Sequence, residues 1–349
     1  MSDDANLFAQ QESNRRRSTW LVIGFIVFFA WAGFGGDLAF ALLTADAPPG
    51  AYHHAVPAIG LFTTLVAAGI CWYSWRHGAE RVLWSTGAWE IIEPDTPEQR
   101  QLVNVVEEMA IASGLPRPRV WVVPDRDPNA FATGRDAATA SIAVTEGLLH
   151  ALSRDELQGV VAHEMAHVRN LDVRLMTLLA AMVGAIALMS DGMGRTLRGT
   201  RNVGGRIGGG RGRGKGGGGN PLGLVILALW LLTLVVAPVV SRLLAMAVSR
   251  KREYLADATG AQLTRNPMAL ASALEKLAAA TSPTRAITRG AAHLCIVDPA
   301  PGMLASREGF FAEVLASHPP VRQRIIRLEG MAYQQAKCTG EPVSRVPLG

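Results

Sequence analysis

The stretch 160-VVAHEMAHVRNLDVRL-175 reads as a largely apolar helix that two histidines and a glutamate interrupt. Side chains four residues apart lie on one face of a helix, so His163 and His167 can offer nitrogens to a single metal ion. Glu164 is then placed beside water that the ion activates, where its carboxylate can take a proton and later pass it to a leaving amine. The alternative is a surface helix with stray histidines. The apolar neighbours predict burial instead, and unpaired buried histidines are uncommon.

Two histidines do not complete a catalytic zinc site, which normally has three protein ligands. The segment 250-RKREYLADATGAQL-263 carries Glu253 and Asp257 four residues apart. Glu253 is a candidate third ligand, and Asp257 is a candidate to hold the far nitrogen of a ligand histidine. From spacing alone His293, His318 and Asp257 also remain possible ligands. Both acids could instead pair with the neighbouring basic residues on a solvated helix.

The composition favours a membrane protein with a polar domain attached, because 49% of the residues are hydrophobic, 18% are charged and the mean hydropathy is +0.19. Apolar runs over about 19–45 and 55–75 are each long enough to cross a bilayer, and their length and pairing favour an uncleaved hairpin over a signal peptide. Basic residues flank both outer ends and predict that these ends are cytoplasmic. Asp37 interrupts the first run, either as a functional acid or at a helix break in GFGGD.

The remaining polar segments predict a small α+β domain. Thr96-Pro97-Glu98-Gln99 is a capping signal for a helix that ends near Gly114. Residues 118–124 are typical of a strand, and 129–147 of two short strands with a turn near 134–136. A second capping box at Ser153 predicts the start of the HExxH helix, which we expect to run into a third apolar stretch at about 175–190. The three cysteines suggest no disulfide framework, and reduced thiols fit a cytosolic domain.

A glycine- and arginine-rich linker, 203-VGGRIGGGRGRGKGGGG-219, separates the third apolar run from a fourth at about 221–248. Its composition predicts disorder. If both runs span the membrane, the basic loop lies outside, against the positive-inside rule; the alternative is a hydrophobic hairpin that leaves the loop cytoplasmic. The loop could bind anionic lipid headgroups. Nucleic acid is disfavoured as a partner, since interleaved aromatic residues are missing.

These motifs resemble, in order and spacing, the HtpX family of membrane zinc metallopeptidases, with CAAX-prenyl endoproteases as more distant relatives. The resemblance rests on HEMAH, SRKREYLADATG, ALEKL at 273–277 and SHPPVRQRI at 317–325, and it covers about residues 20–190 and 221–330. It implies one zinc ion per chain. The set of two imidazoles and a carboxylate suits zinc, although it does not exclude cobalt or manganese.

The resemblance also implies roles for individual residues. His163, His167 and Glu253 would bind zinc, Glu164 would be the general base, and Asp257 would orient a ligand histidine. His318 and Arg324 would stabilise the oxyanion, although Arg324 could equally be a surface charge. Asn129, Ala130 and Phe131, in 129-NAFATG-134, would contact extended substrate, or they could form an ordinary packed hairpin.

The sequence therefore predicts a mainly α integral membrane protein with an α+β zincin-like catalytic domain, made of the HExxH helix and a small β-sheet or hairpin. The expected segments are a polar tail (1–17), a transmembrane hairpin (18–76) and a first part of the catalytic domain (77–173). Two further hydrophobic segments with a loop at 195–220 follow (174–248), and then a second part of the catalytic domain (249–330) and a C-terminal tail (331–349).

The predicted function is a zinc endopeptidase in a bacterial plasma membrane, with its catalytic domain in the cytoplasm. Damaged or misfolded membrane proteins are the expected substrates, as the resemblance implies, and the lipid bilayer is the other partner. Two rival interpretations are a CAAX-prenyl processing protease and a non-catalytic, metal-stabilised membrane scaffold whose glycine- and arginine-rich loop binds lipid or nucleic acid.

Overall fold

The structure is a computed structural model that describes residues 3–45, 54–180, 182, 252–280, 294–297 and 319–339. The chain forms two compact units. The first, here the sheet unit, contains Met1–Ser18, His77–Ala181 and Leu243–Gly349. The second, here the hairpin unit, contains Thr19–Arg76 and Met182–Arg242. The glycine- and arginine-rich loop and the fourth apolar run lie outside the described residues.

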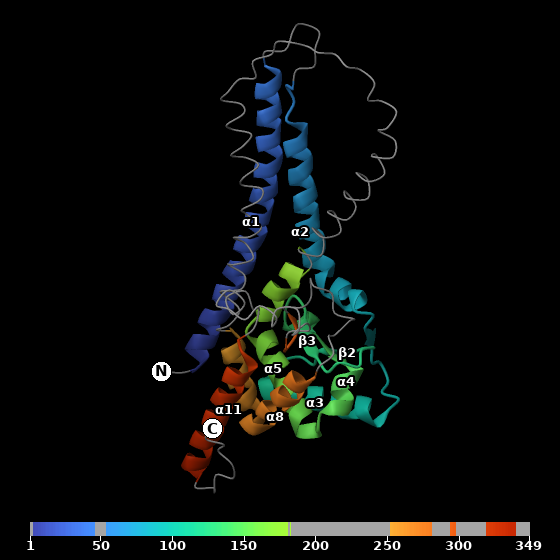
Figure 1. The fold of residues 1–349 in the computed structure, drawn as a ribbon, viewed down its shortest axis with the longest axis vertical. Helices are drawn as coiled ribbons and strands as arrows, with labels where there is room; N and C mark the ends of the chain where they lie inside the picture. Colours follow the sequence, from blue (N-terminus) through green and yellow to red (C-terminus); the bar gives the residue numbers. More distant parts are fainter. Residues whose placement is uncertain are drawn as a thin grey trace. The chain divides into compact units, whose positions relative to one another are not determined.

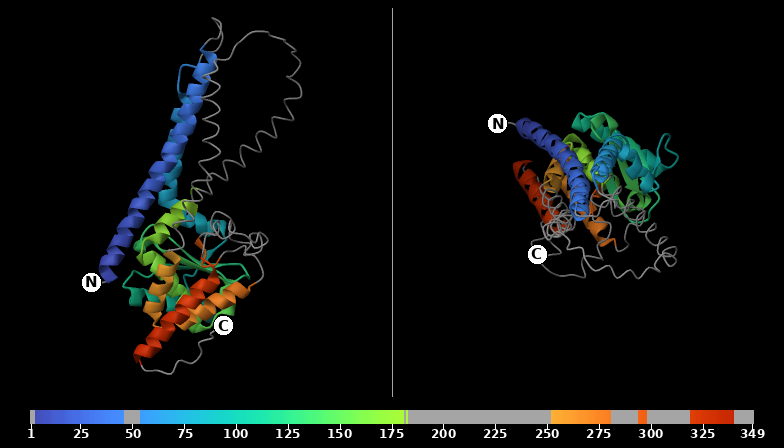
Figure 2. Two further views of the ribbon diagram at one scale, coloured as in Figure 1. Left: turned by 60° about the vertical axis from the view of Figure 1, so that its left-hand side comes forward. Right: turned by 90° about the horizontal axis from the view of Figure 1, so that it is seen from above.

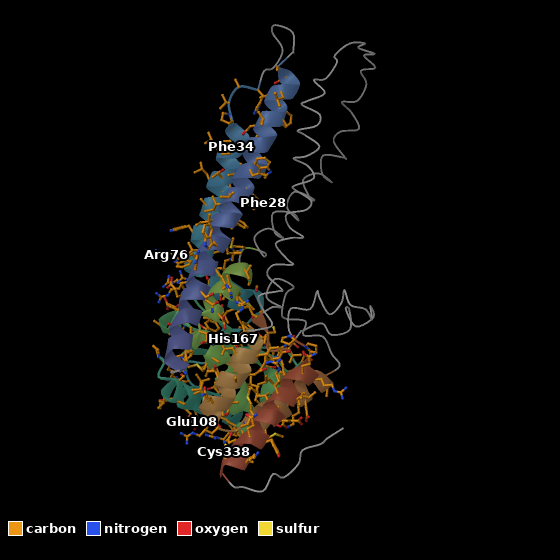
Figure 3. The ribbon with its side chains drawn as sticks, turned by 90° about the vertical axis from the view of Figure 1, so that its left-hand side faces the viewer. Phe28, Phe34, Arg76, Glu108, His167 and Cys338 are labelled. Atoms are coloured by element: carbon orange, nitrogen blue, oxygen red, sulfur yellow. The ribbon has the colours of Figure 1, made fainter. Side chains whose placement is uncertain are left out.

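Two long helices supply the described part of the hairpin unit, α1 (Asp3–Thr44) and α2 (Ala58–Ser85) (Figure 1). Both are long and apolar enough to cross a membrane. Gly33 lies where they pack, because a Cβ there would approach the Gly60 Cα to 2.6 Å. Many large apolar side chains on the two helices are exposed, as expected for surfaces that face lipid. Phe28 and Phe34 are two of the apolar residues along α1 (Figure 3).

Asp37 does not mark a break, because α1 is continuous through GFGGD. The carboxylate is buried and accepts hydrogen bonds from the backbone N–H groups of Gly60, at 2.6 Å, and Ile59, at 3.3 Å. His54 Nε2 lies 2.6 Å from the same carboxylate. The carboxylate of Asp37 satisfies two N–H groups in the first turn of α2, so Asp37 has a structural explanation.

The sheet unit is built around a four-stranded mixed sheet of order β1-β2-β4-β3. Its strands are β1 (Trp89–Glu90), β2 (Arg119–Val123), β3 (Ala130–Thr133) and β4 (Ser141–Thr145). β2 and β4 are parallel, whereas β1 pairs with β2 and β3 with β4 in antiparallel fashion. The predicted strand and hairpin are thus confirmed. A short 3₁₀ turn, η1 (Ala137–Thr139), connects β3 to β4.

Both faces of this sheet are buried, because successive side chains along a strand point to opposite faces and each face packs in a core. Val120, Val122, Ile142 and Val144 belong to a core shared with the helices of the unit. Trp121, Val123, Phe131 and Ala143 point to a second core, which includes residues from the end of α2 and from 294–295. The sheet therefore lies between two cores and packs against the segments that form them.

Helices cover the first of these cores. α3 (Pro97–Ser113) has Thr96 as its N-cap and ends before Gly114, as predicted; Gly114 is the C-cap, with a left-handed φ of 67°. A short helix, α4 (Glu146–Ala151), leads to α5 (Arg154–Arg169), which carries the HExxH motif and starts with the predicted capping box at Ser153. α5 packs against α3, β3 and α8 (Pro267–Ala279), and α8 also lies beside α11 (Val321–Thr339) (Figures 1 and 2).

Three boundaries differ from the sequence prediction. The polar N-terminal segment is helical from Asp3, as part of α1. α5 does not run straight into the third apolar stretch, because the chain turns at Asn170 and Leu171 and a new helical stretch covers 172–180. α11 continues to Thr339, since Met331 packs on the core and the residues after it are good helix formers.

The described part of the chain is thus mostly helical, with two candidate membrane helices and a small mixed sheet. This coarse part of the predicted fold class is confirmed. Cys71 and Cys295 are buried free thiols and Cys338 is an exposed one, in agreement with the predicted lack of a disulfide framework.

Candidate metal centre

The structure brings together the three residues that the sequence singles out as metal ligands. His163, His167 and Glu253 each offer one ligand atom, and these atoms all lie within 4.8 Å of one another. The two Nε2 atoms are 3.2 Å apart on α5. The carboxylate of Glu253, on a helical stretch over 252–264, lies 3.7 Å from the Nε2 of His163 and 3.5 Å from that of His167.

The helical stretch with Glu253 approaches α5 closely enough to set this geometry. Gly260 faces the ligand position, and a Cβ there would lie 3.1 Å from the backbone N of His163 and 3.2 Å from its Cα. Any side chain would push the two backbones apart by a few tenths of an ångström. The absence of a side chain at Gly260 therefore helps to bring the third candidate ligand within reach of the histidines.

Asp257 lies behind the first histidine. Its Oδ1 is 3.0 Å from the Nδ1 of His163, which leaves Nε2 to face the cluster. Arg324 of α11 donates to both oxygens of Asp257, at 2.8 Å and 2.7 Å, and to the carbonyl oxygen of Ile296 at 2.7 Å. Burial alone would raise the pKa of Asp257, but the charge of Arg324 and the hydrogen bond with His163 lower it to about 2.

Asp172, which the sequence analysis missed, lies behind the second histidine. Its Oδ2 is 3.2 Å from the Nδ1 of His167. Asp172 comes close to His167 because Leu171 has a left-handed φ of 58°, which turns the chain back at the end of α5. Asp172 is five positions after His167, and in a continuous helix this spacing would not place the two residues on one face. The sequence signal would have been an acid just after a predicted helix end.

The two histidines differ electrostatically. Burial, the largest effect, lowers the pKa of His163, and the neighbouring Arg324 also favours the neutral ring. Burial also acts to lower the pKa of His167, but the hydrogen bond with Asp172 and the charge of Glu253 outweigh it and raise that pKa to about 9. A metal ion that binds here would have to displace a proton from His167.

Glu164 has the properties of a proton acceptor that works near neutral pH. Its carboxylate is buried, and Oε1 has no hydrogen-bond partner within the described ranges. Burial and the charge of Glu253 raise its pKa to about 7, although the charge of His167 and a backbone hydrogen bond from Ala132 act in the opposite direction. A group with such a pKa can both take and return a proton.

The other predicted site residues are placed as follows. Arg324 is fully buried, and its guanidinium lies 3.5 Å from a Glu253 oxygen and 3.5 Å from the His163 ring nitrogens. Its role at the oxyanion stays a prediction. His318 lies outside the described residues.

Two of the predicted substrate residues, Ala130 and Phe131, lie on β3, an edge strand of the four-stranded sheet, and Asn129 directly precedes it. The chain's own segment 294–297 already contacts this edge: the N–H of Ile296 donates to the Ala130 carbonyl oxygen at 3.0 Å, and Asn129 Nδ2 donates to the Val297 carbonyl oxygen at 3.1 Å. Phe131 forms an antiparallel bridge with Cys295. A substrate role for Asn129, Ala130 and Phe131 stays a prediction, and it would require sharing or replacing these bonds.

The residues fit a divalent metal ion. Two imidazoles and one carboxylate are a set that catalytic zinc sites use, with the fourth position left for water. Each imidazole has a buried carboxylate behind it, as metal-binding histidines usually do. The unsatisfied oxygen of Glu164 is next in sequence to His163 and suits a group that acts on water at such a site.

The chain is similar to a known protein family and to several known proteins. The model of Peptidase family M48 matches residues 96–332. A "Protease HtpX homolog" of Caldanaerobacter subterraneus subsp. tengcongensis is 42% identical over 261 residues, covering 74% of this chain and 80% of that protein. One of Dictyoglomus turgidum is 37% identical over 321 residues, covering 92% and 93%. The crystal structure of S. mikatae Ste24p is 14% identical with a TM-score of 0.40, covering 93% of this chain and 66% of that one.

The family match, the relatives named HtpX and the two apolar helices define a membrane metalloprotease as the class of protein. The chain belongs to peptidase family M48, among relatives named HtpX. The family resemblance predicted from the motifs is therefore confirmed.

Proposed function

We propose that this chain is a membrane-bound zinc endopeptidase in which His163, His167 and Glu253 hold one zinc ion. The observation that supports the proposal best is the cluster of three ligand atoms within 4.8 Å, with the buried carboxylate of Glu164 beside it. Zinc, when bound, would supply Lewis acidity that makes water a nucleophile near neutral pH and polarises the scissile carbonyl.

Glu164 is the general base. Its carboxylate takes a proton from the attacking water and then donates that proton to the nitrogen of the leaving amine, so the group returns to its starting state. A pKa raised to about 7 suits both steps. Asp257 and Asp172 hold the Nδ1 atoms of the two histidines, so that both Nε2 atoms stay directed at the ion.

The developing oxyanion needs a donor, and His318 with Arg324 is proposed for this role. Extended substrate is proposed to run along β3 through Asn129, Ala130 and Phe131, where main-chain hydrogen bonds are insensitive to sequence. Such recognition suits a protease of damaged or misfolded membrane proteins. The basic residues Arg15, Arg16, Arg17, Arg76 and Arg81 support a cytoplasmic sheet unit below a plasma membrane.

The decisive experiment measures zinc content and casein cleavage for the full chain purified in detergent. We expect Glu164→Gln to keep zinc and to lose cleavage by about 10²-fold or more, whereas Glu253→Ala loses most of both. Glu108→Gln is the matched control, because Glu108 is a surface carboxylate of α3 (Figure 3) that pairs with Arg154, and it should behave as wild type.

Two results would refute the proposal. Undiminished cleavage by Glu164→Gln would show that Glu164 is not the general base. Full zinc occupancy in Glu253→Ala would show that Glu253 is not the third ligand. Retained zinc without cleavage in the wild type would instead favour a scaffold. Cleavage of prenylated but not of unmodified peptides would favour a CAAX-type processing protease.

A further inference from the structure

The first turns of α1 contact the end of the HExxH helix. Asn14 is 0% exposed, and its Nδ2 donates to the carbonyl oxygen of Asn170 at 2.8 Å and to Oδ1 of Asp172 at 2.7 Å. Gln11 donates to the carbonyl oxygen of Arg169 at 2.7 Å. All of these residues belong to the sheet unit. The N-terminal part of α1 therefore reaches the residues around the metal centre.

The two oxygens of Asp172 have different partners. Oδ2 faces the Nδ1 of His167 at 3.2 Å, whereas Oδ1 accepts from Asn14 and lies 3.8 Å from a guanidinium nitrogen of Arg252. A donor on one oxygen fixes the rotation of the carboxylate and so fixes the direction of the other oxygen. Because an amide is neutral, Asn14 does this without adding a charge close to the candidate metal site.

The arrangement repeats the one on the other histidine. There Asp257 faces the Nδ1 of His163, and Arg324 holds Asp257 with two hydrogen bonds. Each of the two histidines thus has a carboxylate behind it, and each carboxylate has a donor from a distant helix. Asn14, on α1, is the donor that holds Asp172.

The burial of Asn14 is costly and needs an explanation. Its Oδ1 is buried and has no hydrogen-bond partner in the described part of the chain, and an unsatisfied buried acceptor costs about 1–3 kcal/mol. An apolar side chain would avoid that cost if the contact served only to attach α1 to α5. The amide is therefore retained for the two bonds that it donates.

We propose that Asn14 is a positioning residue of the metal centre: it holds Asp172 so that His167 keeps its proton on Nδ1 and presents Nε2 to the ion. This inference rests on the proposed zinc function. It means that the helix that leads into the membrane is part of the metal site's supporting structure.

The test uses the full chain in detergent and measures zinc affinity by competition with a chromophoric chelator. Outer-shell changes typically weaken metal binding by about 10- to 100-fold. We expect a loss in that range for Asp172→Ala and a smaller loss, about 3- to 10-fold, for Asn14→Ala. Asn14→Asp, which cannot donate a hydrogen bond to Asp172, should bind zinc at least as weakly as Asn14→Ala. The visible absorption of the cobalt-substituted protein should change in the same variants.

A double variant separates positioning from general damage. In the Asp172→Ala background, Asn14→Ala should weaken zinc binding no further, because the carboxylate it holds is gone. Gln11→Ala is the matched control, since Gln11 also attaches α1 to the end of α5 but does not contact Asp172. It should leave zinc affinity and the cobalt spectrum as in wild type. The thermal unfolding of the metal-free protein shows whether each variant folds.

Wild-type zinc affinity and cobalt spectrum in Asn14→Ala would overturn the inference, and so would an equal loss in Gln11→Ala. Additive losses in the double variant would also overturn it, since they would show a structural effect independent of Asp172. Failure of the wild type to bind zinc would instead refute the proposed function itself, and the inference would fall with it.

Discussion

Arg324 is the bulkiest of the fully buried side chains that the structure describes. A buried guanidinium is costly unless its charge and N–H groups are matched. Here Asp257 matches the charge and takes two hydrogen bonds, and the carbonyl of Ile296 takes a third. The charge and hydrogen bonds of Asp257 raise the pKa of Arg324 although burial acts to lower it, so the pair stays ionised.

We expect Arg324→Met to destabilise the protein by about 3–5 kcal/mol, because it leaves Asp257 buried without its counter-charge. The measurement is thermal unfolding of the metal-free protein in detergent. Arg324→Met combined with Asp257→Asn should regain part of the loss. Arg322→Met, at an exposed position two residues earlier in α11, is the control and should change stability by less than about 0.5 kcal/mol. Equal stability of the two single variants would contradict the expectation.

At the scale of elements, α5 is held at both ends by side chains from distant segments. At its N-terminus, Glu156 accepts hydrogen bonds from Ser272 and Lys276 of α8, both at 2.7 Å, and from the N–H of Ser153 at 2.7 Å. Burial alone would raise the pKa of Glu156, but Lys276, Ser272 and Ser153 lower it from 4.5 to about 2. These bonds join the HExxH helix to α8.

This pairing predicts a pH dependence of stability. The folded-state pKa of Glu156 lies below its ordinary value, so its ionised form stabilises the fold above pH 4.5 and this contribution is lost as the pH falls toward 2. Glu156→Gln should cost about 1–2 kcal/mol at pH 7, and its melting temperature should converge with that of wild type on acidification. A difference in melting temperature that does not depend on pH would contradict this account.

The sequence predicts the elements whose signals are local. The cap at Thr96, the stop at Gly114 and the capping box at Ser153 involve neighbouring residues only, and each was placed correctly. Asp172 was missed because its position depends on a left-handed residue, Leu171, that no glycine or asparagine signals. Asn14 was missed because its partner lies 158 residues away, and the pairing of Ile296 with β3 is also long-range.

At the scale of the whole molecule, the hairpin unit anchors the chain through the packing of α1 on α2. The two helices approach closely at Gly33, since a Cβ there would lie 2.0 Å from Thr63 Oγ1 and 2.9 Å from the Ile59 carbonyl oxygen. Without a hydrophobic driving force between helices in lipid, such close backbone contact is a main source of association.

Gly33→Leu should therefore disrupt the hairpin and cost about 1–3 kcal/mol or more, as overpacking does. Gly24→Leu is the matched control on the same helix, because nothing lies within 4 Å of a Cβ at Gly24. Melting temperature and size-exclusion profile in detergent give the readout. Wild-type behaviour of Gly33→Leu would show that the two helices do not depend on this contact.

The order in which the supporting residues occur along the chain has a consequence for biosynthesis. Asn14, Asp172, Glu253 and Arg324 are translated in that order, and the apolar runs lie between them. A growing chain holds the HExxH helix long before the ribosome reaches Arg324, the residue that supplies the counter-charge of Asp257. In the proposed zinc peptidase, proteolytic activity would therefore be expected only after the apolar runs have been made.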